Sequence, residues 1–126
     1  MESGFKGLRV YQLAYKLAME IFSLTKTYPK DENYSLVTQI RRSSRSVCAN
    51  IAEGYRRRKY PKHFSSKLTD ADTECTETLV WLDFSKECNY LDPKTHQEVY
   101  SQYEQVGHML GKMINNPDTF LPKADR

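Results

Sequence analysis

The chain has 126 residues, which fits one domain, and 39% apolar residues are enough to build one hydrophobic core. Its 19 basic and 16 acidic residues give a net charge of +3, too mild to identify a nucleic-acid-binding protein by itself. No stretch approaches the roughly 20 apolar residues of a membrane span, and no signal peptide is visible. We therefore expect a cytoplasmic protein with no membrane partner.

Four segments with helical periodicity lie between the prolines, because proline interrupts helix interiors but is accepted in a first turn. In each segment apolar side chains recur in steps of three and four residues, as on one face of a helix. The first stripe is Val10, Ala14, Leu17, Ile21, Leu24 and Tyr28. The second is Leu36, Ile40, Ser43, Val47 and Ile51, with Ser44 and Cys48 alongside.

The third and fourth segments show the same spacing. The third stripe is Phe64, Leu68, Ala71, Cys75, Leu79 and Leu82, widened by Trp81, Phe84, Cys88 and Leu91. The fourth is Val99, Tyr103, Val106, Leu110 and Met113. Asp92 before Pro93 is typical of a helix start, and Asn33 or Ser35 can cap the second helix. No useful length of sequence alternates with a period of two, so strands are not expected.

Short connections favour antiparallel neighbours, so the sequence predicts an all-α, up-down-up-down four-helix bundle. Each helix should contain about 20 residues and measure roughly 30 Å. We expect a flexible N-terminal segment over residues 1–7, the bundle over 8–116 and a C-terminal tail over 117–126. The equal spacing of three prolines also raises a helical repeat, but the tetratricopeptide pattern is missing.

Catalytic and metal-binding motifs are missing from the sequence. A di-metal bundle needs Glu-x-x-His on two helices, but no carboxylate stands three residues before His63, His96 or His108. The glycines form no phosphate-binding loop. Three widely spaced cysteines suit neither a disulfide framework nor a zinc site, and two of them, Cys48 and Cys75, fall on apolar stripes. We expect no enzyme activity, no cofactor and no metal.

The charges are strongly segregated along the chain. Residues 41–63 contain eight basic residues and one acid, whereas residues 70–92 contain seven acids and one base. In a functional interpretation, the basic end of the second helix contacts phosphates, with Tyr55 and Tyr60 available to stack on single-stranded bases. The candidate nucleic-acid-binding residues are Arg42, Arg56, Arg57, Arg58, Lys59 and Lys62.

A structural interpretation competes with the functional one. The basic second helix and the acidic third helix are neighbours in a hairpin, so their charges can pair within the bundle or across a subunit boundary. We expect this pairing for Arg41 and Arg45, which share one helix face. Their expected partners share a stripe of the third helix: Asp70, Glu74 and Glu77. For residues 56–59 both interpretations stay open, since a run at a helix end cannot face one partner.

A polar residue, Asn50, adjoins the second apolar stripe three residues after Val47. Such a residue near a bundle seam can determine register or oligomeric state. We hypothesise that Asn50 and Glu53 form a polar lock, within a subunit or between subunits. Gly54 either caps the helix or permits a close approach of its neighbour.

The stretch "QIRRSSRSVCANIAEGYRRR", residues 39–58, resembles the signature of the four-helix-bundle proteins encoded in 23S rRNA intervening sequences, also labelled S23 ribosomal proteins. "FKGLRVYQLAYKL" and "TYPKDENYSL" resemble the family's start and first turn. The similarity extends over about residues 5–115. The matching signature positions are Gln39, Ile40, Arg41, Arg42, Ser46, Asn50, Ile51, Ala52, Glu53 and Gly54.

This resemblance implies a four-helix bundle that assembles as a ring-like homo-oligomer such as a pentamer. It implies little about activity, because the label reflects where the genes occur. Accessory proteins of diversity-generating retroelements are similar bundles with basic surfaces that assist a reverse transcriptase. We therefore expect a non-catalytic oligomer that binds nucleic acid, RNA rather than DNA, through the basic run. The alternative is a protein-interaction scaffold, or an accessory subunit of a nucleic-acid enzyme, that uses its charged helix faces.

Overall fold

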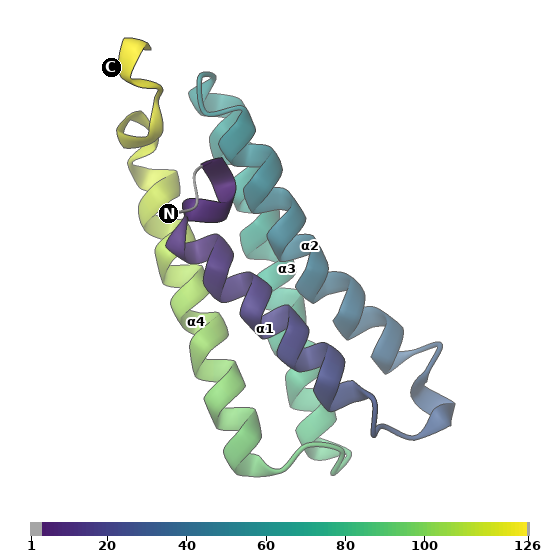
Figure 1. The fold of residues 1–126 in the computed structure, drawn as a ribbon. Coiled ribbons are helices and arrows are strands. Elements are labelled where there is room, and N and C mark those ends of the chain that lie inside the picture. Colours follow the sequence, from purple (N-terminus) through teal and green to yellow (C-terminus); the bar gives the residue numbers. More distant parts are fainter. Residues whose placement is uncertain (1–3, 126) are drawn as a thin grey trace.

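The computed structural model describes residues 4–125, which form an antiparallel bundle of four α-helices (Figure 1). α1 spans Arg9–Thr25, α2 spans Leu36–Arg56, α3 spans Pro61–Glu87 and α4 spans Pro93–Asn115. Each helix packs against two neighbours: α2 lies against α1 and α3, and α4 lies against α3 and α1. These residues contain no strand. The predicted all-α, up-down-up-down four-helix bundle is confirmed.

The four helices differ in length more than expected, from 17 residues in α1 to 27 in α3. At 1.5 Å per residue, α3 measures about 40 Å. It is long because Pro61 begins it directly after the preceding turn. Proline is accepted there, since the first N–H groups of a helix have no partner in the helix.

The predicted cap of α4 is confirmed. The Asp92 carboxylate accepts hydrogen bonds from the backbone N–H of Thr95 at 2.8 Å and from its hydroxyl at 3.0 Å, and Pro93 follows in the first turn. The expected side-chain cap of α2 does not form. Ser35 stands at the cap position, but its hydroxyl donates to the Glu32 carboxylate at 2.6 Å instead of capping the helix.

The core contains most of the predicted stripes. Its largest fully buried side chains come from all four helices, so the stripes meet along the bundle axis. They are Leu17, Ile21, Ile40, Val47, Ile51, Phe64, Leu68, Leu82, Val99, Tyr103, Val106 and Leu110. Leu24 and Leu79 are half-buried at the stripe edges. Cys48 and Cys75 are buried thiols, as predicted.

The predicted widening of the third stripe is wrong at two positions. Phe84 is 54% exposed and Cys88 is also exposed. Their places on the core face of α3 are taken by Thr78 and Ser85, which are buried and donate to helix carbonyls at 2.9 Å. Polar side chains can occupy a core when their hydroxyls are bonded in this way. The buried stripe therefore continues from Leu82 to Ser85.

Both chain ends carry short 3-10 turns. Residues Gly4–Gly7 form η1, whose Phe5 ring lies 5.1 Å from the Tyr11 ring, and the Lys6 carbonyl accepts a bond from Gln12 at 2.9 Å. Beyond α4, η3 (Pro117–Phe120) stacks Phe120 on Phe64, and η4 (Lys123–Asp125) follows. Residues Gly4–Gly7 and Pro117–Phe120 therefore contact the bundle. Residues 1–3 and 126 lie outside the described residues.

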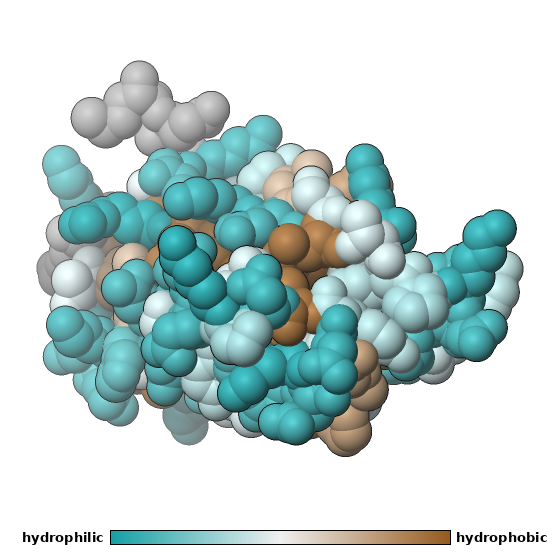
Figure 2. Space-filling view, turned by 90° about the horizontal axis from the view of Figure 1, so that it is seen from below, coloured by the Kyte–Doolittle hydropathy of each residue, from teal (hydrophilic) through white to brown (hydrophobic). Residues whose placement is uncertain are grey.

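η1 and the turns that follow α4 lie at the same end of the bundle as the turn between α2 and α3 (Figure 1). The opposite end contains the α1–α2 connection, with its 3-10 turn η2 (Lys30–Glu32), and the α3–α4 connection. Figure 2 views this opposite end, where hydrophilic residues surround a small hydrophobic area. The basic run therefore lies at the same end of the elongated bundle as η1 and η3.

Candidate nucleic-acid interface

The basic run forms the turn between α2 and α3. α2 ends at Arg56, and Arg57 leaves the helix with φ −107° and ψ 17°. Four residues, 57–60, complete the connection before Pro61 begins α3. Positive side chains are favourable at a helix C-terminus, where the peptide dipoles present their negative end. We call residues 56–62 the basic turn.

Most cations of the basic turn project into solvent. Arg56, Arg57, Lys59 and Lys62 are exposed, and their side chains form no ion pair or hydrogen bond within residues 4–125. Arg58 is different because it is half-buried: its guanidinium lies 4.3 Å from the centre of the Tyr55 ring and donates to the Tyr55 carbonyl at 3.2 Å. The turn therefore combines free positive charges with one arginine held against an aromatic ring.

One further cation reaches this place from the start of the chain. Lys6 of η1 lines a shallow depression of about 440 Å³ together with Tyr55, Arg56 and Arg58. Sequence reasoning missed Lys6 because some 50 residues separate it from the run. Only the packing of η1 against α2 brings the two together.

The sixth candidate residue, Arg42, lies away from the basic turn and is occupied. Its guanidinium binds Glu74 of α3 through two bonds of 2.8 and 3.2 Å and also contacts Glu77 at 2.5 Å. The Arg42 guanidinium holds the pKa of the Glu74 carboxyl at about 2, well below its usual value. This arginine connects α2 to α3 and is not a free phosphate ligand in this structure.

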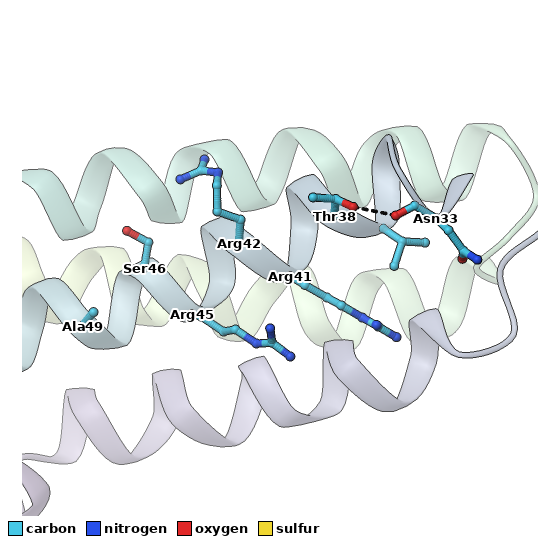
Figure 3. A pocket seen from close by; sticks show the side chains of 8 residues that line it. Asn33, Thr38, Arg41, Arg42, Arg45, Ser46 and Ala49 are labelled. Atoms are coloured by element: carbon cyan, nitrogen blue, oxygen red, sulfur yellow. Dashed lines mark hydrogen bonds between the residues drawn. The ribbon is translucent and has the colours of Figure 1, made fainter. Parts of the chain in front are cut away.

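The expected pairing of Arg41 and Arg45 with the acidic helix is therefore wrong within the chain. Figure 3 shows both side chains extending toward α1, whereas Arg42 extends toward α3. Arg41 donates from Nε to the Thr25 hydroxyl at 2.8 Å and lies 4.7 Å from the centre of the Phe22 ring. The reason is geometric: consecutive residues point about 100° apart around a helix, so Arg42 faces α3 when Arg41 faces α1.

The proposed polar lock does not form within the chain. Asn50 donates to the Ser46 carbonyl and hydroxyl at 3.0 and 3.1 Å, and Glu53 pairs with Lys67 at 3.0 Å. A lock between subunits stays a prediction. Gly54 lies inside α2 and does not cap it; a Cβ there would come within 3.1 Å of the Lys67 Cβ, so the glycine permits close packing of α3.

Comparison with known proteins identifies the family. The family model described as 23S rRNA-intervening sequence protein matches residues 6–112, which include α1, α2, the basic turn, α3 and most of α4. The chain belongs to this family. No curated protein matches the chain. The family description names an rRNA intervening sequence and states no activity.

A solved structure shares the fold of this 23S rRNA-intervening sequence protein. It is a protein with unknown function from the S23 ribosomal protein family of Bacteroides thetaiotaomicron VPI-5482. The TM-score is 0.77 and the sequence identity 24%, with 85% of this chain and 96% of that chain covered. At this identity the likeness concerns the fold alone.

Two further features bear on what this family member can bind. Among residues 4–125, no three His, Cys, Asp or Glu side chains lie close enough together to hold a metal ion. None of the helices formed by these residues combines the length and the apolar character that crossing a bilayer requires. The candidate nucleic-acid interface is the group of exposed cations in the basic turn.

Proposed function

We propose that this family member is a non-catalytic, cytoplasmic RNA-binding protein that contacts phosphates through its basic turn. The observation that carries the proposal is the exposure of four cations without acidic partners: Arg56, Arg57, Lys59 and Lys62. A guanidinium donates paired hydrogen bonds that match phosphate oxygens, and a lysine adds a mobile point charge.

Self-association would strengthen such a weak site. A single basic turn offers few phosphate contacts, but a ring of copies, such as a pentamer, would present several turns to one RNA molecule. Binding by linked sites gains affinity through the effective concentration of the second site. The proposed partners are therefore other copies of the chain and RNA, with DNA as a weaker ligand.

The alternative function is a protein scaffold, or an accessory subunit of a nucleic-acid enzyme, that uses the acidic face of α3. Exposed Asp70 has no ion pair within residues 4–125 and supports this alternative. Two other acids on that face, Glu74 and Glu77, already bind Arg42 of the same chain. The acidic face is thus partly neutralised, whereas the basic turn is not.

The test measures affinity for structured RNA against salt concentration. Phosphate contacts release counterions, so the logarithm of affinity should fall linearly with the logarithm of salt. Replacing Arg56, Arg57 and Lys59 together by alanine should reduce that slope by about 2 to 3. All three side chains are exposed, so the variant should fold normally.

A matched control removes three cations at the opposite end of the bundle, Lys30, Lys86 and Lys94. These lysines also have no ion pair within residues 4–125, and they change the net charge equally. The control should keep most of the affinity and the slope. If both triple variants lose affinity equally, only net charge matters and the basic turn is not the site. Absence of RNA binding by the unmodified chain at low salt contradicts the proposed function itself.

A further inference from the structure

Three shallow depressions follow one another along α2. The first is lined by α2 and the connection before it, the second mainly by α1 and α2, and the third by η1 and the end of α2 with Arg58. The first has a volume of about 590 Å³, the second about 450 Å³ and the third, beside the basic turn, about 440 Å³. Arg45 and Ala49 line both the first and the second, and Phe5 lines both the second and the third. The depressions therefore form one continuous surface feature, which we call the α1–α2 track.

The charge of the track has one sign. Its lining residues include six cations, gathered at the two ends: Arg41, Arg42 and Arg45 in the first depression, Lys6, Arg56 and Arg58 in the third. Arg42 is already bound to Glu74 and Glu77, so five of the six have no carboxylate partner within residues 4–125. No aspartate or glutamate is among the residues that line the three depressions. An acid-free groove with cations at both ends complements an elongated anion.

The middle of the track is aromatic. Tyr15 is 53% exposed, and its ring lies 6.0 Å from the Tyr11 ring, which contacts Phe5 edge-on at 5.1 Å. On the opposite wall α2 contributes the small side chains of Cys48, Ala49 and Ala52, with Arg45 at the end toward the first depression. A flat ligand can therefore approach the tyrosine rings over these small side chains.

The arginines at the far end are held in place before any ligand binds. Arg41 is bonded to Thr25 at 2.8 Å, and both Arg41 and Arg45 lie over the Phe22 ring, at 4.7 and 5.9 Å from its centre. Figure 3 shows the two guanidinium groups side by side above α1. Binding by pre-positioned groups loses less side-chain entropy.

We infer that the α1–α2 track binds one single strand of RNA, with phosphates at its two basic ends and bases against Tyr15 and Tyr11. Arg41 and Arg56 are separated by 15 residues of α2, about 22 Å, which accommodates a few nucleotides. Base stacking on aromatic rings beside a basic groove is how proteins bind single strands without sequence preference. A duplex keeps its bases stacked inside and offers no free base face.

This inference rests on the proposed function, because the track begins at the basic turn, but it adds residues that the turn does not contain. The test uses fluorescence anisotropy with a labelled 12-nucleotide oligouridine RNA and with a duplex RNA of equal length. The variants are Tyr15→Ala and Arg45→Ala. Their matched controls are Tyr34→Ala, a 97% exposed tyrosine outside the track, and Lys30→Ala.

We expect Tyr15→Ala to weaken single-strand binding by about fivefold or more, with the salt dependence unchanged, because stacking involves no phosphate. Arg45→Ala should weaken it and also reduce the salt slope by about 1. Both controls should bind as the unmodified chain does. Duplex affinity should not change in Tyr15→Ala.

Failure of the track and failure of the proposed function give different results. If Tyr15→Ala and Arg45→Ala bind RNA normally while the basic-turn variant does not, the track does not bind RNA and the proposed function stands. If no variant matters because the unmodified chain binds no RNA, both are wrong. If Tyr15→Ala lowers the mass of the protein assembly measured by sedimentation and leaves RNA affinity unchanged, this face is an interface between copies of the chain. That result contradicts RNA binding by the track.

Discussion

Arg42 on α2 binds Glu74 on α3 through a forked pair, with Nη1 2.8 Å from Oε2 and Nη2 3.2 Å from Oε1. Nη2 also reaches Glu77, one helical turn further along α3. Two carboxylates thus hold one guanidinium across the interface between α2 and α3. The contact joins the helix that leads into the basic turn to α3, which carries more acidic residues than any other helix.

This pair should make the bundle sensitive to acid. The folded-state pKa of Glu74 is about 2, against 4.5 for an ordinary glutamate, so the unfolded chain binds more protons between these values. The stabilisation is complete above about pH 4.5 and is lost as pH falls toward 2. Arg42→Gln should cost about 1 kcal/mol at pH 7, since partly exposed ion pairs contribute little more. When the free energy of unfolding is measured by urea at a series of pH values, its decline between pH 4.5 and 2 should also be less steep in this variant.

Arg41→Gln is the matched control for that series. Arg41 carries the same charge one residue away, but its guanidinium contacts Thr25 and Phe22 instead of a carboxylate. Its removal should leave the decline of stability between pH 4.5 and 2 as steep as in the unmodified chain. Equal flattening in both variants would show that net charge, not the pair with Glu74, controls acid stability.

A second prediction concerns Gly54, where α2 and α3 approach closely. Alanine usually stabilises a helix interior by up to about 1 kcal/mol relative to glycine. At Gly54, however, the added Cβ would lie 3.1 Å from the Lys67 Cβ and 3.3 Å from the Leu68 Cδ2. Overpacking of this kind costs about 1 to 3 kcal/mol, so Gly54→Ala should lower the free energy of unfolding by about 1 kcal/mol.

The internal control for Gly54 is another helical glycine, Gly111 of α4. A Cβ at Gly111 has no atom within 4 Å among the described residues. Gly111→Ala should therefore gain up to about 1 kcal/mol from helix propensity. Thermal unfolding of the two variants should shift in opposite directions. A gain at both positions means that the close approach at Gly54 relaxes without cost.

The fold could be predicted because apolar periodicity and proline positions are local properties of the sequence. The errors arose where burial depended on a partner. Thr78 and Ser85 continue the buried stripe of Ala71, Cys75 and Leu82 in steps of three and four, and their hydroxyls can be buried because they bond to helix carbonyls. Phe84 lies on the outer face and is exposed. Hydrophobicity alone predicts the opposite at all three positions: a buried phenylalanine and an exposed threonine and serine.

The candidate site was only partly predictable for a similar reason. The basic turn is contiguous in sequence, so it could be recognised directly. Which arginine of α2 pairs with α3 depends on how the helix is rotated in the bundle, and the answer is Arg42 instead of Arg41 or Arg45. Lys6 and Tyr15 join the track only through packing of segments distant in sequence.

A third prediction follows from the three thiols. Cys88 is exposed, whereas burial raises the pKa of Cys48 to about 11 and of Cys75 to about 12. Because the thiolate is the reactive form, a thiol reagent at pH 8 should modify one cysteine quickly and the other two only on unfolding. Cys88→Ser should remove the fast phase. Fast modification of all three thiols would indicate that the bundle opens readily.

The last prediction concerns a hydroxyl in the centre of the bundle. Tyr103 is fully buried, and its hydroxyl lies near Ser44 but makes no well-formed hydrogen bond with a described residue. Burial raises the pKa of Tyr103 well above its usual value, so the group stays neutral. An unpaired buried hydroxyl costs free energy that phenylalanine does not. Tyr103→Phe should therefore leave the free energy of unfolding unchanged or raise it by up to about 1 kcal/mol.

Tyr90→Phe is the control for Tyr103→Phe, because the Tyr90 hydroxyl is hydrogen-bonded. The Tyr90 hydroxyl donates to the Glu32 carboxylate at 2.9 Å, so its removal breaks a bond to a charged acceptor. We expect that variant to unfold at a lower urea concentration than the unmodified chain under the same conditions. If Tyr103→Phe loses as much as Tyr90→Phe, the Tyr103 hydroxyl has a partner in solution, and the core of the bundle is wetter than its packing indicates.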